Sequence, residues 1–279
     1  MSERVLYRFT RDLRLTDHAG LAAAAQLGEI VPVLTIDANL VSRLSASPKR
    51  AAFFCRAVAA LATELDRRGV ALVVRRGPAF RSLRQLALAT GARNVAWAAS
   101  FDGRGIAADR GLQSALEEAQ LRITIVPDAP AISPDDIAAA RSIGEGYRAF
   151  TPYFEAWNAA ALSRYEEPIA FAGVEIPSEP LPEPSEFSRE TASVPPVSED
   201  GAKERLRRYL DGPALAYGVA RNVPSAGATS GLGPHLSFGI ISARVVVEAV
   251  RARIASTFLL TEERASLRAF LQSLSLIHI

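Results

Sequence analysis

Five short runs of strand-forming residues alternate with alanine-rich stretches of helical length over the first 126 residues of the chain. This alternation constrains the fold strongly, because strands separated by helices pair in parallel and are joined by helical crossovers. The runs are Val5–Phe9, Ile30–Ile36, Ala71–Arg75, Asn94–Ala98 and Arg122–Val126. We therefore predict that residues 1–130 form an α/β domain with a five-stranded, parallel, doubly wound (Rossmann-like) sheet.

The stretch between the second and third runs carries the clearest helix signals. Ser47 suits an N-cap, Pro48 suits the first helical position, and Gly69 suits the end of the helix. Apolar residues three and four positions apart predict that this helix packs on the sheet, through Phe54, Val58, Leu61 and Leu65. The one cysteine, Cys55, lies in the same apolar stretch, so we expect it to be buried.

Ligands of an open parallel sheet bind at the carboxyl ends of its strands. In this chain those ends lead into four loops, Thr10–Asp17, Asp37–Arg43, Arg76–Phe80 and Ser100–Gly105. The region around the first loop is dense in charge, with Arg8, Arg11, Asp12, Arg14 and Asp17. Two interpretations stay open: ion pairs that close one end of the sheet, or contacts with a ligand.

The character of the sequence changes after residue 165. Seven of the 17 prolines lie between Glu166 and Asp200, mixed with Ser and Glu, and the hydrophobic periodicity disappears. We expect residues 131–200 to connect two domains, with the proline-rich part beginning at residue 166. Beyond it, Ala202–Asp211 and Ser242–Ala255 have helical patterns, so residues 201–279 are predicted to be all-helical.

Two hydroxyls and two glycines lie close together in Thr229-Ser230-Gly231-Leu232-Gly233. Hydroxyls donate hydrogen bonds to phosphate, glycines let the backbone approach it, and a helix N-terminus beyond would add N–H groups. The same composition is also common in an ordinary turn. From the residues alone, both interpretations remain.

Other features exclude several classes of protein. His18, His235 and His278 are far apart, and no Cys/His cluster has metal-ligand spacing, so no metal site is expected. A dinucleotide-binding fingerprint is expected directly after the first strand, whereas Gly144-Glu145-Gly146 follows a stretch rich in Ala and Asp, so we interpret it as a loop. The chain shows no secretory signal pattern and no apolar run of membrane-spanning length, so we expect a soluble, cytoplasmic protein.

Several segments resemble, in order, the DNA photolyase/cryptochrome family. In the α/β part these are Arg11–Leu15, Ser47–Arg50 with the helix behind it, and Leu72–Gly77. Phe150–Tyr153 with Trp157 resembles the family's exit from that domain, and the proline-rich segment lies where the family has a long connection.

The segment from Tyr217 to Gly239 resembles the start of the family's helical FAD-binding domain. The resemblance implies that six residues contact FAD, with the hydroxyls of Thr229 and Ser230 holding its pyrophosphate: Tyr217, Thr229, Ser230, Gly231, Leu232 and Gly233. It also implies that Arg221 approaches a DNA phosphate.

The chain departs from the family pattern at three places. Gly231 and Gly233 stand where many members have Arg and Ser. Arg104-Gly105 stands where folate-binding members have Asn-Glu, so a folate antenna is not expected and the type of any antenna chromophore stays open. Asp102 is either a contact for such a chromophore or a solvated loop carboxylate. After Leu274 the sequence no longer follows the family, so we expect Leu274–Ile279 not to be native and the catalytic residues to lie beyond Ile279.

The resemblance implies a fragment of a blue-light-driven deoxyribodipyrimidine photolyase, a carbon–carbon lyase that splits pyrimidine dimers by electron transfer from reduced FAD. We expect the fragment alone to be inactive and the full-length protein to be a monomer that binds damaged DNA. One alternative is a cryptochrome photoreceptor, with the same fold and flavin but a signalling output. Another is a nucleotide-binding α/β module without photochemistry.

Overall fold

The computed structural model describes residues 3–133, 137, 147–165, 169–173 and 175–276. The chain forms two compact units. The α/β unit comprises Met1–Asp128, Tyr165–Glu199 and Ser237–Ile240. The helical unit comprises Ala129–Arg164, Asp200–Leu236 and Ile241–Ile279. The units therefore interleave along the chain, and the domain limits expected at residues 130 and 200 stay a prediction.

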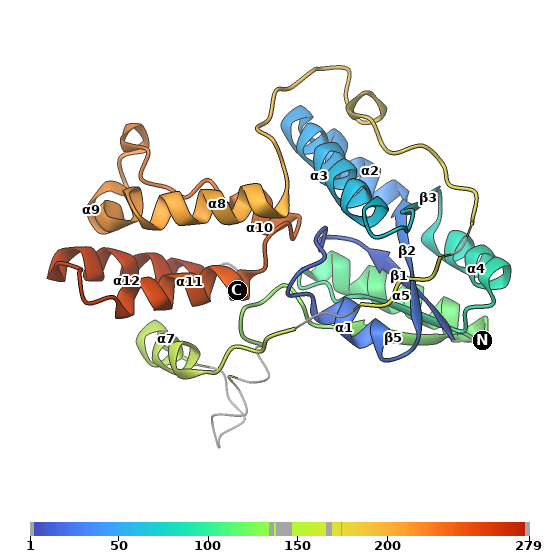
Figure 1. Cartoon of the computed structure of the whole chain (residues 1–279), viewed down its shortest axis with the longest axis horizontal. Coiled ribbons are helices and arrows are strands. Elements are labelled where there is room, and N and C mark those ends of the chain that lie inside the picture. The colour runs from blue at the N-terminus through green and yellow to red at the C-terminus, as the bar shows by residue number, and fades with distance from the viewer. Residues whose placement is uncertain (1–2, 134–136, 138–146, 166–168, 174, 277–279) are drawn as a thin grey trace. The chain divides into compact units, whose positions relative to one another are not determined.

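The α/β unit contains one five-stranded sheet in which every pair of neighbouring strands is parallel (Figure 1). The strand order is β3-β2-β1-β4-β5, so the direction of winding reverses between β1 and β4. The strands are β1 (Arg4–Phe9), β2 (Glu29–Ile36), β3 (Val73–Arg76), β4 (Asn94–Ala98) and β5 (Arg122–Val126). The predicted fold class is confirmed, and the third strand begins two residues later than expected.

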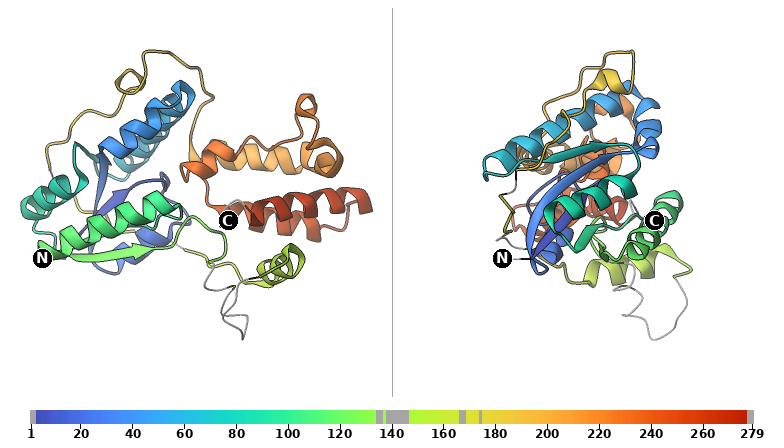
Figure 2. Two further views of the ribbon diagram at one scale, coloured as in Figure 1. Left: turned by 180° about the vertical axis from the view of Figure 1, so that it is seen from behind. Right: turned by 90° about the vertical axis from the view of Figure 1, so that its right-hand side faces the viewer.

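Helices follow the strands as predicted: α1 (Ala19–Ala25), α2 (Ala38–Ser45), α3 (Pro48–Asp66), α4 (Ala79–Thr90) and α5 (Gly103–Glu118). The Ser47 side chain accepts a hydrogen bond from the Arg50 N–H, which caps α3 as expected. Leu83 of α4 and Leu116 of α5 belong to a buried cluster with Trp97 of β4, so these two helices cover one face of the sheet (Figure 2). Cys55 is buried, as predicted.

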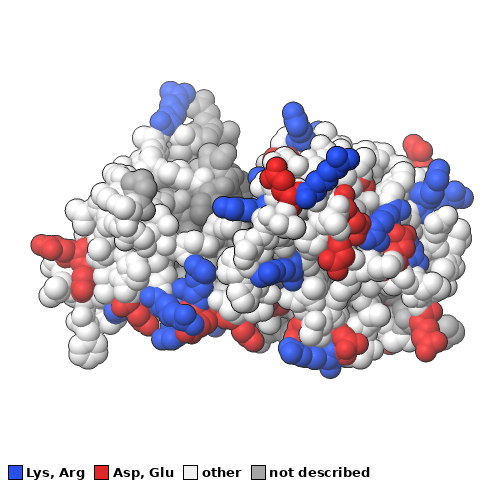
Figure 3. Space-filling view, turned by 90° about the horizontal axis from the view of Figure 1, so that it is seen from above, with Lys and Arg blue, Asp and Glu red and all other residues white. Residues whose placement is uncertain are grey.

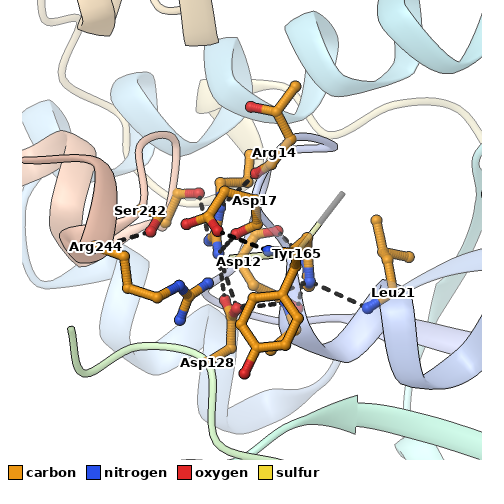
Figure 4. Close-up of polar contacts among 12 residues, drawn as sticks. Asp12, Arg14, Asp17, Leu21, Asp128, Tyr165, Ser242 and Arg244 are labelled. Atoms are coloured by element: carbon orange, nitrogen blue, oxygen red, sulfur yellow. Dashed lines mark hydrogen bonds and ion pairs between the residues drawn. The ribbon is translucent and has the colours of Figure 1, made fainter. Parts of the chain in front are cut away.

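The charged loop after β1 is held by buried partners within the α/β unit (Figure 4). Arg14 donates to both carboxylate oxygens of Asp128 at 2.7 and 2.8 Å, and both side chains are at most 3% exposed. Asp12 accepts hydrogen bonds from the Tyr7 hydroxyl and from the Thr10 N–H, each at 2.6 Å. The structure therefore favours the interpretation that an ion pair and hydrogen bonds within the protein close this end of the sheet.

The proline-rich segment lies along the α/β unit, past β3 and α3 (Figure 1). Strand β3 is an edge strand, so one side of it has no neighbouring strand. On this strand, the Val74 carbonyl accepts a hydrogen bond from the Glu179 N–H of the proline-rich segment. Arg76 at the end of β3 then pairs with Glu179 at 3.2 Å and with Glu186 at 2.8 Å. Backbone and charge contacts thus attach the segment to the sheet edge, and Ile176 adds apolar packing against the buried cluster of the α/β unit.

The helical unit contains α7 (Phe150–Ala159), α8 (Glu199–Leu210), α9 (Tyr217–Ala220), α10 (Gly233–Ser237), α11 (Ala243–Ala255) and α12 (Thr261–Ser275). Short 3-10 turns occur at Pro213–Ala216 and Pro224–Ala226, and at Pro184–Glu186 in the α/β unit. Arg251 of α11 donates to three carbonyls at the end of α7 and lies over the Trp157 ring at 5.7 Å. The two helices predicted after residue 200 are present, with Ser242 as N-cap of α11.

Phe258 and Leu260, in the turn between α11 and α12, are 93% and 69% exposed. No helix in the described part of the chain is long and apolar enough to cross a membrane. The Gly144-Glu145-Gly146 stretch lies outside the described residues.

Candidate cofactor-binding site in the helical unit

A cluster of three aromatic side chains is connected to the Gly-rich loop through Tyr209. The Phe270 ring of α12 makes edge contacts with Tyr209 of α8 and Tyr217 of α9, at centroid distances of 5.0 and 5.3 Å. The buried Tyr209 hydroxyl donates to the Ala228 carbonyl at 3.2 Å, directly before Thr229. Burial raises the pKa of Tyr209, so the phenol stays protonated and keeps its donor. The start of the loop is thereby attached to two helices.

Within the loop, buried and exposed residues have different roles. Leu232 is 1% exposed, and its N–H donates to the Ser230 hydroxyl oxygen at 3.2 Å. Since that hydroxyl accepts here, its own hydrogen remains available to donate. Thr229, Gly231 and Gly233 are exposed, so their polar groups are accessible from solvent. Leu232 anchors the loop while its neighbours can face a ligand.

Arg205 of α8 lies directly beside Gly231. A Cβ atom added to Gly231 would be 2.9 Å from Arg205 Nη1, closer than ordinary van der Waals contact allows. Gly231 also has a φ of +62°, which glycine adopts without strain. Nearby, the pKa of buried His235 is lowered by desolvation and by the charge of Arg205, which favours the neutral imidazole. Arg205 thus brings a positive charge to the loop.

Tyr217 begins α9, and Arg221 is the C-cap residue of this helix. The Tyr217 hydroxyl donates to Ser273 Oγ at 3.1 Å, which orients the half-buried ring against α12. The exposed Arg221 guanidinium lies 5.8 Å from the centre of that ring. Arg221 therefore keeps its N–H donors toward solvent, as contact with a phosphate requires.

The second half of the motif has a different role from its first half. Residues Ser237–Ile240 belong to the α/β unit, where the Phe238 ring stacks on Phe53 at 5.8 Å. The Phe238 carbonyl accepts a hydrogen bond from the Leu13 N–H at 3.0 Å. A Cβ on Gly239 would be 2.3 Å from the Arg11 carbonyl oxygen, so only glycine fits this close backbone approach.

A helix follows the Gly-rich loop, as expected, but it is short. It is α10, which begins at Gly233 and has only five residues. The longer helix α11 begins at Ala243, after the segment that belongs to the α/β unit. Any anion at this loop would therefore be held by loop donors and Arg205, without a long helix N-terminus.

The donor set fits a pyrophosphate group. Two hydroxyls, glycine backbone and a guanidinium converge on one loop, and Gly231 leaves the space that the guanidinium occupies. The sequence alone did not identify Arg205, Tyr209 or Phe270 as part of the site. Tyr209 and Phe270 lie in ordinary apolar helix faces, and Arg205 is one of several arginines in α8, so no local pattern distinguishes them. Among the described residues, no group of three or more His, Cys, Asp or Glu side chains has the arrangement of a metal site.

Comparison with known proteins identifies the family. The sequence model of the DNA photolyase family matches residues 5–183, which is more than half of the chain. The chain belongs to the DNA photolyase family. This match covers the sheet and about half of the proline-rich segment, whereas the loop at Thr229–Gly233 lies outside it.

Individual relatives of this photolyase-family chain extend the likeness to the loop. It is 30% identical to a deoxyribodipyrimidine photo-lyase of Halobacterium salinarum, over 97% of this chain and 59% of the relative. An uncharacterized 31.6 kDa protein of Synechococcus sp. PCC 6716 is 28% identical, over 97% of this chain and 96% of that protein. The crystal structure of a class III photolyase from Agrobacterium tumefaciens matches with a TM-score of 0.79 and 26% identity, over 97% of this chain and 57% of the other. The chain thus spans about half the length of the photo-lyases it matches.

Proposed function

We propose that this chain provides the α/β domain and the first part of the FAD-binding domain of a deoxyribodipyrimidine photo-lyase. The observation that carries the proposal is that the likeness to named photo-lyases extends over nearly the whole chain. The Gly-rich loop that the family motif assigns to FAD is also held by two hydrogen bonds, and its residues Thr229, Gly231 and Gly233 are exposed. We place the domain limits near residues 130 and 200, as the sequence indicates.

In the proposed site, Thr229, Ser230, Gly231 and Gly233 hold the pyrophosphate of FAD, Leu232 fixes the loop, and Tyr217 borders the cofactor. Bound FAD would supply the photochemistry, which is light-driven electron donation to a pyrimidine dimer. The chain's own part is to bind and orient: Tyr209 holds the loop at Ala228, and Ser273 orients the Tyr217 ring. We place the groups that act on the dimer outside this chain.

The proposed partner is damaged DNA, with Arg221 near a backbone phosphate. The formal net charge is only +2, and basic and acidic side chains are interspersed on the face drawn in Figure 3. Contact with DNA would therefore depend on a few positioned arginines rather than on a strongly basic surface. A cytoplasmic, monomeric full-length protein and an antenna chromophore other than folate complete the proposal.

The test is to express the chain from its own locus, together with any coding sequence contiguous with it, and to record visible flavin absorption. Dimer splitting is then measured on ultraviolet-irradiated DNA under blue light and in the dark. Flavin bands with light-dependent repair support the proposal, and flavin without repair favours the cryptochrome alternative. If neither this chain nor the contiguous product binds flavin, the motif from Tyr217 to Gly233 has another role. Repair by this chain alone would contradict the expected inactivity of the fragment.

A further inference from the structure

Arg205 differs from the other arginines of helix α8 in its surroundings. Arg207 and Arg208 both donate to the Glu204 carboxylate, at distances of 2.7 to 2.8 Å. Arg205 is exposed, and within the described part of the chain no carboxylate forms an ion pair with it. An arginine beside a loop of hydroxyls and glycines, with no carboxylate of its own, is suited to an anionic ligand.

The geometry at Gly231 explains how Arg205 reaches the loop. Its Nη1 atom is 2.9 Å and its Cζ atom 3.8 Å from the position of a Cβ on Gly231. Any larger residue at this position would therefore have to displace the guanidinium. The positive charge beside the loop is thus supplied by a neighbouring helix.

We propose that Arg205, which reaches the Thr229–Gly233 loop from α8, is a phosphate-binding residue of that loop. The ligand class is a pyrophosphate diester, such as the one that joins the two halves of a dinucleotide. This inference rests on the proposed function for the identity of the natural ligand. It does not require the flavin ring, because the residues involved would contact only the phosphate part.

The test uses the full 279-residue chain and probes that contain the phosphate part alone. Inorganic pyrophosphate and ADP are titrated, with adenosine as the uncharged comparison, and amide resonances of the loop are followed by NMR. We expect Arg205→Gln to weaken binding of pyrophosphate and ADP about tenfold, the loss typical of one charge-assisted hydrogen bond. Arg205→Lys should restore part of the affinity, because it keeps the charge without the planar fork.

Arg208→Gln is the matched control, because it removes the same charge from the same helix at a residue that pairs with Glu204. We expect less than about a twofold change for this variant, as for a screened surface charge. Equal effects of the Arg205 and Arg208 variants would overturn the inference, as would binding of neither probe by the unaltered chain. The two proposals can fail separately. If pyrophosphate binding depends on Arg205 but the contiguous gene product does not bind flavin, the inference is supported and the flavin part of the proposed function is rejected.

Discussion

Replacing Gly239 by alanine should strongly destabilise the α/β unit. The new Cβ would lie 2.3 Å from the Arg11 carbonyl oxygen and 2.6 Å from the Asp12 Cα, and both are backbone atoms that cannot rotate away. The φ of +66° adds about 1–2 kcal/mol of strain for an L-residue. Moving the segment apart would also lengthen the 3.0 Å bond from Leu13 N–H and the 3.2 Å bond from Arg14 Nη1. The first bond contributes about 1 kcal/mol and the charged one somewhat more. Added to the backbone strain, these losses should lower the free energy of unfolding by roughly 3–5 kcal/mol.

Urea unfolding followed by tryptophan fluorescence measures this loss. Of the two tryptophans, Trp97 is buried in β4 of the α/β unit, so a Trp157→Phe background leaves it as the reporter of that unit. Gly91→Ala is the matched control, because Gly91 has a φ of +72° but no atom within 4 Å of an added Cβ. We expect it to cost only the backbone strain, about 1–2 kcal/mol. If Gly239→Ala is no more destabilising than Gly91→Ala, the close-approach argument is wrong.

Three further predictions concern other parts of the α/β unit. Asp128→Asn leaves the buried Arg14 without its carboxylate and should lower the free energy of unfolding by about 3–5 kcal/mol in the same assay; an unchanged midpoint would contradict this. The hydrogen bond from Arg76 lowers the pKa of Glu186 from its usual 4.5. The Arg76–Glu186 pair therefore stabilises the attachment of the proline-rich segment fully above pH 4.5, and this stabilisation is lost as the pH falls through the lowered pKa of the folded chain. Cleavage of the segment by an acid-active protease should therefore rise with acid in the native chain, whereas Arg76→Met should be cleaved readily at every pH. Burial raises the pKa of Cys55 to about 12, so a thiol reagent at pH 8 should label it only after denaturant is added, and fast labelling of the folded chain would show an accessible thiolate.

Much of the α/β unit could be predicted because its signals are local. Each strand contains a short run rich in apolar and β-branched residues, and Ser47 and Pro48 mark the start of α3 through groups only a few residues apart. The alternation of strand and helix then restricts the sheet to a parallel one. The strand order and the identity of β3 as an edge strand were not predicted, since they depend on pairings between distant segments.

The sequence by itself determined that the loop from Thr229 to Gly233 is a candidate phosphate site, because hydroxyls and glycines lie within five consecutive residues. Only the tertiary structure decided that Arg205 supplies the charge, since it is brought to Gly231 by the packing of α8 against the loop. The structure also assigned Phe238 and Gly239 to the α/β unit and attached the proline-rich segment to the edge of β3. Contacts of this kind depend on which surfaces meet after folding, and short-range patterns in a sequence do not record them.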